Sequence, residues 1–593
     1  MLQPVDSHNP TGYSYAGPEI LGDGYAFSAL ESNIRNLDST EALFICAKIN
    51  LVISEASFRG FDCPKVQAFV TSDLWSLEWI SPFDTVALEA ALKPPHLKIL
   101  FGRQGLFELM RWLALWDGPV VDPSRQRMSY IRALLNANDL ASEYQGSISR
   151  DEIGPAAGDL KMFLALRLFR ELTLWQSPTF DPRWQFGRAR ALFIEGFLKD
   201  NPDYRNQLEE RLKMSLEDYL ACVIAILSIS QNWFVPGRIP RLRSNLEIDL
   251  ATVSQDLKPE MKSIVSQFFE LTSRNVSELT ELIKKKFSDP AVSFELRPFR
   301  EKPLLTDGEN RLVIVDQTLL AECGSAGLLF RLLPKNGESV FVSFGKSFEN
   351  YVSGVLAGYV STMQTSKSGF SGWGPALNAN NKHEELSDFI MIDGETVALI
   401  ETKTGVIKDS LVRQTAEQYW AELMTRYGMS ESHEGKKSKG VYQLARSIKR
   451  WVEGTARLEE PLESKVTPKT IIPVLLVYDP YLPILGHGYF LAKEFNLALT
   501  GQSTTNPSFS LNGVEVKTLC LMSIDQFETF EGSITKKTLP QLLLEYCEQY
   551  PYRDITAGAY LSQLQPESEM FESKLVRESL QALDAARIRL FGV

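Results

Sequence analysis

The sequence predicts an α/β protein in which a mixed β-sheet flanked by helices follows a large, mostly α-helical region. Two observations lead to this fold class. Through much of the first half of the chain, apolar residues recur at three- and four-residue intervals, which is the period of an amphipathic helix. Between residues 387 and 521, short apolar runs bounded by turn residues alternate with further helical patterns, as in a sheet covered by helices.

These patterns divide the 593 residues into successive regions. We predict a mostly α-helical N-terminal region over 1–290, a connector with short strands over 291–338, the sheet-containing core over 339–530, and C-terminal helices over 531–593. The helical patterns lie at 40–57, 105–116, 160–175, 215–230 and 258–286 in the first region, and at 539–550 and 567–591 in the last.

A β-hairpin over 387–403 is the clearest local signal in the core. Asp393-Gly394 separates two apolar runs, and Asp and Gly tolerate the positive φ values of the primed turns that favour hairpins. Both runs are apolar on both faces, which is typical of strands covered on both sides. We therefore expect this hairpin to lie in the middle of the sheet.

The register of the hairpin decides which side chains meet. A two-residue loop places Asp388 opposite Leu399, and a four-residue loop places it opposite Glu401. In either register Asp388 shares one face with Glu401 and Lys403, because strand side chains alternate with a period of two. Opposed or diagonal carboxylates, about 5 to 8 Å apart at Cβ, can grip one divalent cation. A surface ion pair is the alternative interpretation of such residues.

These three side chains suit phosphodiester hydrolysis. Asp388 and Glu401 offer the hard oxygen ligands that Mg²⁺ or Mn²⁺ prefers. The ammonium group of Lys403 can orient a water nucleophile or stabilise charge that develops on phosphorus. Carboxylates at the end of a buried hairpin are unfavourable without such a compensating cation.

The motif resembles that of the PD-(D/E)xK nuclease superfamily. It reads Ser387-Asp388, twelve intervening residues, then Glu401-Thr402-Lys403, with Ser in place of the superfamily's Pro. The resemblance implies a restriction-endonuclease-like core in which Asp388 and Glu401 are catalytic and bind the metal, and Lys403 is catalytic. It also implies an auxiliary acidic ligand on a preceding helix and a polar residue near the scissile phosphate.

Glu349 is the residue that resembles the auxiliary metal ligand. Helical spacing predicts a helix that begins with Ser347 as its N-cap and runs to Leu356, with Glu349 at the margin of its apolar stripe. A first-turn Glu favoured by the helix dipole is the alternative.

Gln443 is similar to the polar residue that many superfamily members place near the scissile phosphate, so we expect it to be catalytic. It opens a predicted helix over 441–454. Gln414 and Gln418, on the preceding predicted helix over 410–427, are rivals for this role.

The remaining elements of the core follow from shorter signals. Apolar segments at 470–478 and 514–521 predict further strands, and Pro473 indicates that its strand starts late or lies at an edge. The polar stretch 428–440 and the Gly-rich stretch 369–374 are predicted to be loops.

The net charge of −12 and the isoelectric point of about 5.3 mean that the overall field repels nucleic acid. A bound nucleic acid must therefore be held by a local basic surface, because phosphate contacts supply most non-specific affinity. A solvated basic loop is the alternative for these residues. The nucleic-acid-binding candidates are Lys436, Lys437, Lys439 and Arg446.

Cysteine usage and hydropathy indicate a cytoplasmic protein without a membrane partner. The 6 cysteines show no paired spacing and read as reduced core thiols. The first residues lack the pattern of a signal peptide. The longest apolar segment, 219–229, is shorter than the roughly 20 residues that span a bilayer.

We therefore expect a hydrolase, namely a Mg²⁺- or Mn²⁺-dependent endonuclease that acts on DNA rather than RNA. The architecture resembles that of nucleases of prokaryotic antiviral defence or restriction. The helical regions would sense a target or bind a partner protein or a second copy of the chain. Two alternatives stay open: a catalytically silent nuclease-fold protein that binds or scaffolds, and an RNA-cleaving enzyme.

Overall fold

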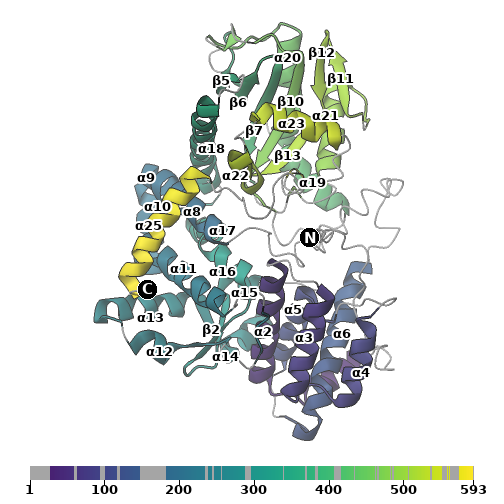
Figure 1. The fold of residues 1–593 in the computed structure, drawn as a ribbon, viewed down its shortest axis with the longest axis vertical. Helices are drawn as coiled ribbons and strands as arrows, with labels where there is room; N and C mark the ends of the chain where they lie inside the picture. Colours follow the sequence, from purple (N-terminus) through teal and green to yellow (C-terminus); the bar gives the residue numbers. More distant parts are fainter. Residues whose placement is uncertain are drawn as a thin grey trace.

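The sheet-containing part of the chain lies at one end of the molecule, and two groups of helices lie at the other (Figure 1). This computed structural model describes residues 27–58, 63–93, 100–116, 120–146, 182–233, 238–242, 246–255, 257–286, 296–337, 339–366, 370–380, 385–405, 416–432, 435–460, 462–463, 466–480, 482–483, 487–504, 506–533, 537–550, 557, 560 and 573–591. The predicted α/β class, with a mixed sheet flanked by helices, is confirmed.

The first group of helices is a bundle with its own hydrophobic core. Buried side chains such as Leu51, Phe107 and Leu134 fill it. The predicted helices over 40–57 and 105–116 are confirmed. The bundle contains α1 (Phe27–Ile34), α2 (Ser39–Phe58), α3 (Cys63–Ser76), α4 (Pro82–Ala91), α5 (Arg103–Leu115), the 3-10 helix η3 (Pro123–Arg125) and α6 (Gln126–Gly146).

The second group of helices surrounds a different core. It includes α11, which confirms the helix predicted over 215–230, whereas the pattern at 160–175 lies outside the described residues. Its members are α8 (Pro182–Ala189), the π-helix η5 (Arg190–Phe197), α9 (Leu198–Asp200), α10 (Pro202–Leu212), α11 (Leu216–Asn232), α12 (Leu250–Gln255), α13 (Pro259–Thr272), α16 (Gln317–Cys323), α17 (Ala326–Asn336) and α25 (Lys574–Phe591). Helices α14 (Val276–Lys286) and α15 (Arg297–Glu301) instead contribute Leu279, Ile283 and Phe299 to the core of the first group.

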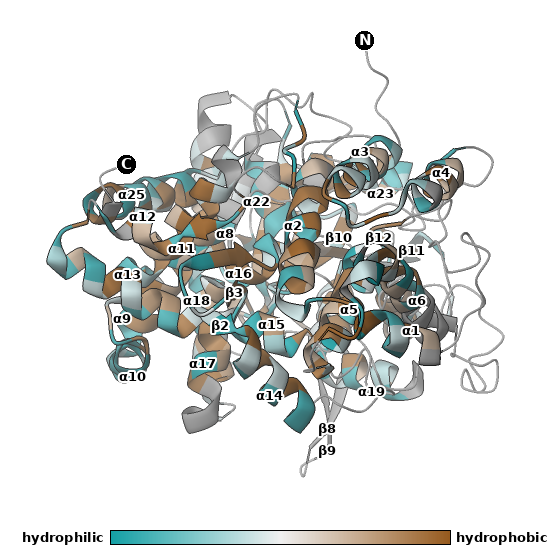
Figure 2. Cartoon of the chain, turned by 90° about the horizontal axis from the view of Figure 1, so that it is seen from below, coloured by the Kyte–Doolittle hydropathy of each residue, from teal (hydrophilic) through white to brown (hydrophobic). Residues whose placement is uncertain are grey.

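Hydropathy follows this arrangement. Hydrophobic residues gather where α8, α11 and α16 meet, and the peripheral helices α10 and α14 are largely hydrophilic (Figure 2).

None of the described helices is long and apolar enough to cross a membrane. Cys63 is exposed, so the expectation that all cysteines are core thiols is wrong at that position.

A small sheet interrupts the second group of helices. Its strand order is β1 (Ile248–Asp249), β4 (Arg311–Ile314), β3 (Leu304–Thr306) and β2 (Ser273–Asn275). The single helix predicted over 258–286 is therefore wrong in its middle, where β2 separates α13 from α14. The Asn275 side chain accepts a hydrogen bond from the Glu278 backbone and so starts a new helix.

The larger sheet has the strand order β11-β12-β10-β7-β6-β5, and β13 pairs with β10 as well. Strands β7, β10, β12 and β13 are parallel to one another where they pair, whereas β5, β6 and β11 run antiparallel to their neighbours. The strands are β5 (Phe370–Leu377), β6 (Glu385–Asp393), β7 (Thr396–Lys403), β10 (Thr470–Val477), β11 (Ser508–Leu511), β12 (Val514–Lys517) and β13 (Cys520–Ser523).

The predicted hairpin is formed by β6 and β7. Asp393 pairs with Thr396 across a loop of Gly394 and Glu395, and Gly394 has a φ of 57°. This turn is shifted by one residue from the expected Asp393-Gly394 loop. In this register Asp388 lies opposite Glu401, as in the register predicted for a four-residue loop.

Both faces of the hairpin are buried, as predicted. Phe389, Met391, Ala398 and Ile400 belong to the core that continues into the second group of helices. Alternate residues such as Ile390 and Leu399 belong to a third core. Helices α18 (Ser339–Ser366), α22 (Ile524–Ser533) and α23 (Leu539–Gln549) contribute to the former core, and α19 (Ala416–Tyr427), α20 (Gly440–Val452) and α21 (His487–Thr500) contribute to the latter.

Pro473 lies in the middle of a central strand, so the prediction of a late start or an edge position is wrong. It pairs with Leu399 on one side. On its other side, β12 pairs with β10 only at Thr470 and Ile471, and β13 pairs only from Val474 onward. Neither β12 nor β13 pairs with β10 at Pro473. The missing N–H of the proline therefore leaves no carbonyl of these two strands without a donor. The gap between β12 and β13 also divides the single strand predicted over 514–521.

Three further expectations for the core are corrected. The Gly-rich stretch 369–374 is mostly strand β5 rather than a loop. The polar stretch 428–440 contains a hairpin of β8 (Met429–Ser432) and β9 (Gly435–Ser438). Ser347 is not an N-cap, because α18 already begins at Ser339, and the Ser347 hydroxyl donates to the Ser343 carbonyl at 3.4 Å.

Candidate active site

Glu401 and Lys403 lie at the carboxyl end of β7, two residues apart on one face. The Nζ atom of Lys403 is 2.6 Å from Oε1 of Glu401, whose side chain is 0% exposed. The other carboxylate oxygen of Glu401, Oε2, is buried and has no hydrogen-bond partner among the described residues. A buried carboxylate with one unpaired oxygen is unfavourable unless another group binds it.

A second Glu-x-Lys pair in the same sheet shows what is particular to β7. On β12, Nζ of Lys517 is 2.7 Å from Oε1 of Glu515, but the Glu515 side chain is 42% exposed. Water can therefore satisfy the second oxygen of Glu515. The surface ion-pair interpretation describes this pair and does not describe Glu401.

Asp388 is held beside Glu401 by the strand backbone. The hairpin ladder ends where Phe389 pairs with Ile400, and the next position opposite Asp388 is Glu401. Its Oδ2 atom accepts hydrogen bonds from the backbone nitrogen and from Oγ1 of Thr402, both at 2.6 Å. One oxygen of Asp388 is thus engaged within the hairpin.

Burial and the neighbouring charges shift the proton affinities of the pair. Burial raises the pKa of Glu401 to about 8; the charge of Lys403 lowers this pKa and the charge of Asp388 raises it. Burial alone would lower the pKa of Lys403, but the charges of Glu401 and Asp388 raise it above its ordinary value. The site therefore combines a protonated amine with a carboxyl group that releases its proton near neutral pH.

Helix α18 brings Glu349 and Lys346 to the same end of the sheet. A Cβ atom placed on Gly345 would lie 3.7 Å from Oγ1 of Thr404, just beyond β7. The Nζ atom of Lys346 is 3.2 Å from Oε2 of Glu349. The charge of Glu349 contributes to the raised pKa of Lys403, so Glu349 lies within electrostatic reach of the site.

Two residues of this site, Thr402 and Lys346, were not predicted from the sequence, whereas Glu385 could be read either as a further ligand near Asp388 or as part of a solvated loop. Thr402 points away from Glu401 by strand alternation, so nothing in the pattern linked it to Asp388. Lys346 could have been found as an ion-pair partner of Glu349, because residues three apart on a helix are neighbours. Glu385 lies at the start of β6, where burial and the charges of Asp388 and Glu349 raise its pKa.

Gln443 lies half-buried in the first turn of α20. Gly440, at the start of this helix, packs against the Tyr427 carbonyl, and the Tyr427 hydroxyl donates to the Gly405 carbonyl at 2.6 Å. The beginning of α20 is therefore seated close to the end of β7. Within the described residues, however, the Gln443 side chain makes no hydrogen bond to the Glu401 carboxylate or the Lys403 ammonium.

The predicted rivals and basic residues lie around α19 and α20. Gln414 lies outside the described residues, and Gln418 is exposed on α19. The basic candidates follow one another along the chain from the hairpin into the helix: Lys436 and Lys437 lie in β9, Lys439 is the N-cap residue of α20, and Arg446 is exposed on α20.

The donor set can accept a divalent cation, although it is not arranged as a finished metal centre. Among the described residues, no three His, Cys, Asp or Glu side chains converge on one point as metal ligands would. Glu401 nevertheless has a buried oxygen without a partner among the described residues, and its carboxylate lies within electrostatic reach of Asp388. Mg²⁺ is bound in proteins through only one or two carboxylates, with water completing its octahedron. The residues therefore fit such an ion.

No protein-family model, curated protein or solved structure matches the chain.

Proposed function

We propose that the chain is a Mg²⁺- or Mn²⁺-dependent nuclease with a restriction-endonuclease-like core, acting on DNA. The observation that carries this proposal is the state of Glu401. Its carboxylate is fully buried, one oxygen is paired with Lys403 at 2.6 Å, and the other has no partner among the described residues. An acidic group kept in this state at the end of a strand is typical of a site that binds a cation.

Glu401 and Asp388 would hold the cation, with Glu349 approaching from α18. Such an ion, when bound, acidifies its water and neutralises charge on a phosphate group. Glu401 must give up its proton first, because its raised pKa leaves it partly protonated at neutral pH. The hydrogen bonds from Thr402 hold one oxygen of the Asp388 carboxylate against β7.

Lys403 would act on the reacting phosphodiester directly. Its raised pKa keeps the amine protonated throughout the physiological range, so it serves as a hydrogen-bond donor and a positive charge rather than as a base. The Lys403 side chain is 24% exposed at the end of β7, so it can orient a water molecule and stabilise charge developing on a phosphate oxygen.

Lys346 would hold a neighbouring phosphate of the substrate backbone. Its side chain is 73% exposed, and it lies on the same helix face as Glu349. In an acidic protein, a cation at the rim of the site offsets the repulsion that a polyanion meets there.

The decisive experiment incubates the purified chain with supercoiled plasmid, linear duplex DNA, single-stranded DNA and RNA, each with Mg²⁺, Mn²⁺ or EDTA. We expect cleavage that requires the metal and is abolished in Lys403→Ala and Asp388→Ala. Lys517→Ala is the matched control, because it breaks the same Glu-x-Lys pair on β12. Cleavage that survives Lys403→Ala would refute the proposal, and preference for RNA would change the substrate but not the site.

A binding protein without turnover is the second candidate. It is favoured by the pairing of both carboxylates within the hairpin, where Thr402 bonds one oxygen of Asp388 and Lys403 bonds one oxygen of Glu401. Metal-independent binding of nucleic acid, with no cleavage of any substrate, would support this candidate over the nuclease.

A further inference from the structure

We propose that Arg188 is a positioning residue for the candidate active site, through an ion cluster that fixes the helix bearing Glu349 and Lys346. Arg188 lies in the second group of helices, whereas its partners lie on helices packed against the larger sheet. The catalytic consequence rests on the proposed function, and the structural consequence does not.

The cluster is buried and centres on a forked interaction between Arg188 and Glu528. Nε of Arg188 donates to Oε1 of Glu528 at 2.7 Å, and Nη2 donates to Oε2 at 2.6 Å. Nη2 also bonds Asp525 on the same helix, α22. The side chains of Arg188 and Glu528 are 8% and 0% exposed. Only a guanidinium group supplies this planar pair of donors.

Tyr351 ties α18 to the same carboxylate. Its hydroxyl donates to Oε1 of Glu528 at 2.6 Å. Burial and the charge of Glu528 raise the pKa of Tyr351, which keeps the hydroxyl as a donor. One carboxylate thus joins α8, α18 and α22, and each bond depends on the placement of the others.

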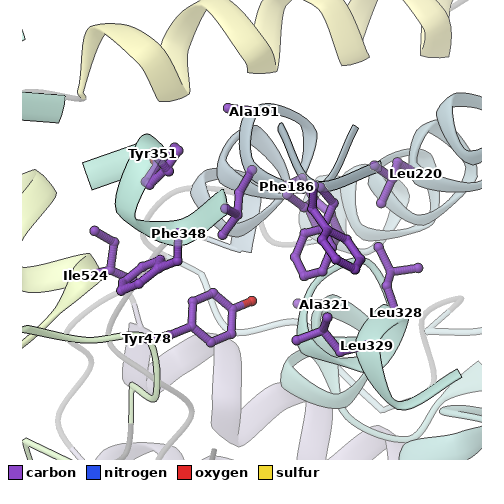
Figure 3. Packing of buried hydrophobic residues seen from close by; sticks show 14 of the residues in the cluster. Phe186, Ala191, Leu220, Ala321, Leu328, Leu329, Phe348, Tyr351, Tyr478 and Ile524 are labelled. Atoms are coloured by element: carbon purple, nitrogen blue, oxygen red, sulfur yellow. The ribbon is translucent and has the colours of Figure 1, made fainter. Parts of the chain in front are cut away.

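The cluster holds one face of α18, and the orientation of that face determines where Glu349 and Lys346 lie on the opposite face. At 100° per residue, Phe344, Phe348 and Tyr351 share one face of the helix, and Lys346 and Glu349 share the opposite face. The first face contacts the second group of helices and the sheet interior (Figure 3). A rotation of α18 about its axis would therefore displace Glu349 from the end of β7.

The π-helix η5 directly follows Arg188 and packs on the same face of α18. The ring of Phe193 stacks on Phe344, with centroids 5.1 Å apart, and a Cβ on Gly196 would lie 4.0 Å from that of Ser347. Insertions that form π-helices are frequent at functional sites. This one lets the chain turn from the Arg188 contact to close packing on α18.

A second connection runs through Tyr478 to Lys403. The Tyr478 ring meets Phe344 and Phe348 edge-to-face, at 5.1 and 5.7 Å between centroids. Its backbone nitrogen donates to the Lys403 carbonyl at 2.9 Å. Figure 3 shows Tyr478 between Phe348 and the helices that carry Ala321 and Leu329. The face of α18 that Arg188 fixes is thus also in contact with the strand end that bears Lys403.

The test combines hydrogen exchange with cleavage kinetics in Arg188→Met, Arg188→Lys and the double variant Arg188→Met/Glu528→Met. In both single variants we expect amide exchange over 344–352 and 400–405 to accelerate about tenfold or more, with α5 unchanged. We expect kcat to fall about tenfold and the KM for DNA to rise by less than that, because the same displacement weakens only the single phosphate contact proposed for Lys346. Arg188→Lys should not rescue the site.

The double variant separates positioning from simple stabilisation. Replacing a buried ion pair by apolar side chains often restores stability. In this variant Tyr351 loses its acceptor as well, so we expect exchange over 344–352 to stay fast and kcat to stay low even when the melting temperature recovers. Recovery of both along with stability would show that Arg188 is merely structural.

Arg300→Met is the matched control, because Arg300 on α15 pairs with Glu322 on α16 at 2.6 Å, away from α18. It should leave exchange over 344–352 unchanged. Unchanged exchange over 344–352 and 400–405 in Arg188→Met would overturn the inference, whether or not the chain cleaves DNA. A wild-type chain that cleaves nothing would refute the proposed function, and the exchange data would still decide the structural role of Arg188.

Discussion

The ammonium group of Lys403 pairs with only one oxygen of the Glu401 carboxylate, and the other oxygen, Oε2, is buried without a hydrogen-bond partner among the described residues. This one-sided arrangement distinguishes β7 from β12, where the same spacing forms a pair whose carboxylate is exposed. It links the stability of the fold to the protonation of the site.

Replacing Glu401 by Gln should change how stability depends on pH. The folded-state pKa of Glu401, about 8, lies above its ordinary value of 4.5, so the folded state holds this proton more tightly than the unfolded state. Wild-type stability should therefore fall as pH rises from about 4.5 to 8, by at most about 1.4 kcal/mol per pH unit from this group. Urea unfolding at several pH values measures the effect.

Glu401→Gln should lack this decline, and so gain stability relative to wild type as the pH rises. Lys403 does not oppose the trend, because it is protonated in both states across this window: its ordinary pKa of 10.5 applies in the unfolded chain, and its folded-state pKa is higher. Glu515→Gln, on the exposed pair, is the control that should keep the wild-type slope. Parallel curves for wild type and Glu401→Gln would contradict the assigned shift.

Cation binding should release a proton below about pH 8. The cation and the proton compete for the Glu401 carboxylate, because metal ligands must be deprotonated. Titration calorimetry with Mn²⁺ in buffers of different ionisation enthalpy counts the protons. We expect about one proton released near pH 6.5 and almost none at pH 9.5, with affinity rising up to about tenfold per pH unit between. Equal proton counts at both pH values would argue against Glu401 as a ligand.

Lys346→Ala should weaken DNA binding and reduce its dependence on salt. Loss of one phosphate contact lowers the slope of log K against log salt by about one. Fluorescence anisotropy with a labelled duplex in the Lys403→Ala background avoids cleavage during the measurement. Lys469→Ala is the control, because Lys469 pairs with Glu395 at 2.7 Å at the turn end of the hairpin, away from the site. Equal slopes for the two variants would remove Lys346 from the substrate surface.

Gly440→Ala should destabilise the start of α20. Gly440 has a φ of 44°, and a Cβ there would lie 2.5 Å from the Tyr427 carbonyl oxygen. We expect a loss of about 2 to 3 kcal/mol in the free energy of unfolding from the strained backbone and the clash. Gly454→Ala, with a φ of 75° and no atom within 4 Å of its Cβ, should lose only about 1 kcal/mol. Similar losses for the two variants in thermal or urea unfolding would show that the backbone around Tyr427 moves to accommodate the added Cβ at little cost.

The sequence predicted those features that short-range patterns determine. The apolar alternation and the Asp-Gly pair were enough for the hairpin and for its two buried faces, but they left open whether Asp388 lies opposite Leu399 or Glu401. The turn shifted by one residue because Asp393 pairs within the ladder and Glu395 takes the loop position. The exact loop is set by packing on both faces, which no local signal encodes.

The errors came from contacts between distant segments. Pro473 reads as an edge residue locally, and only the break between β12 and β13 makes its central position tolerable. The early start of α18 depends on Phe344 packing against Phe193 and Tyr478. No sequence pattern indicated a role for Arg188, because Glu528 and Asp525, which it binds, are more than three hundred residues away in the chain.

That separation has a consequence for biosynthesis. Arg188 and Glu528 are 340 residues apart, so at about 5 to 20 residues per second the arginine leaves the ribosome roughly 20 to 70 seconds before its partner. The β6–β7 hairpin is complete well within that interval. A nascent chain therefore contains Asp388, Glu401 and Lys403 before the ion cluster of Arg188 and Glu528 can form. The translation of α22, which carries Glu528, sets the earliest time at which α18 can be fixed.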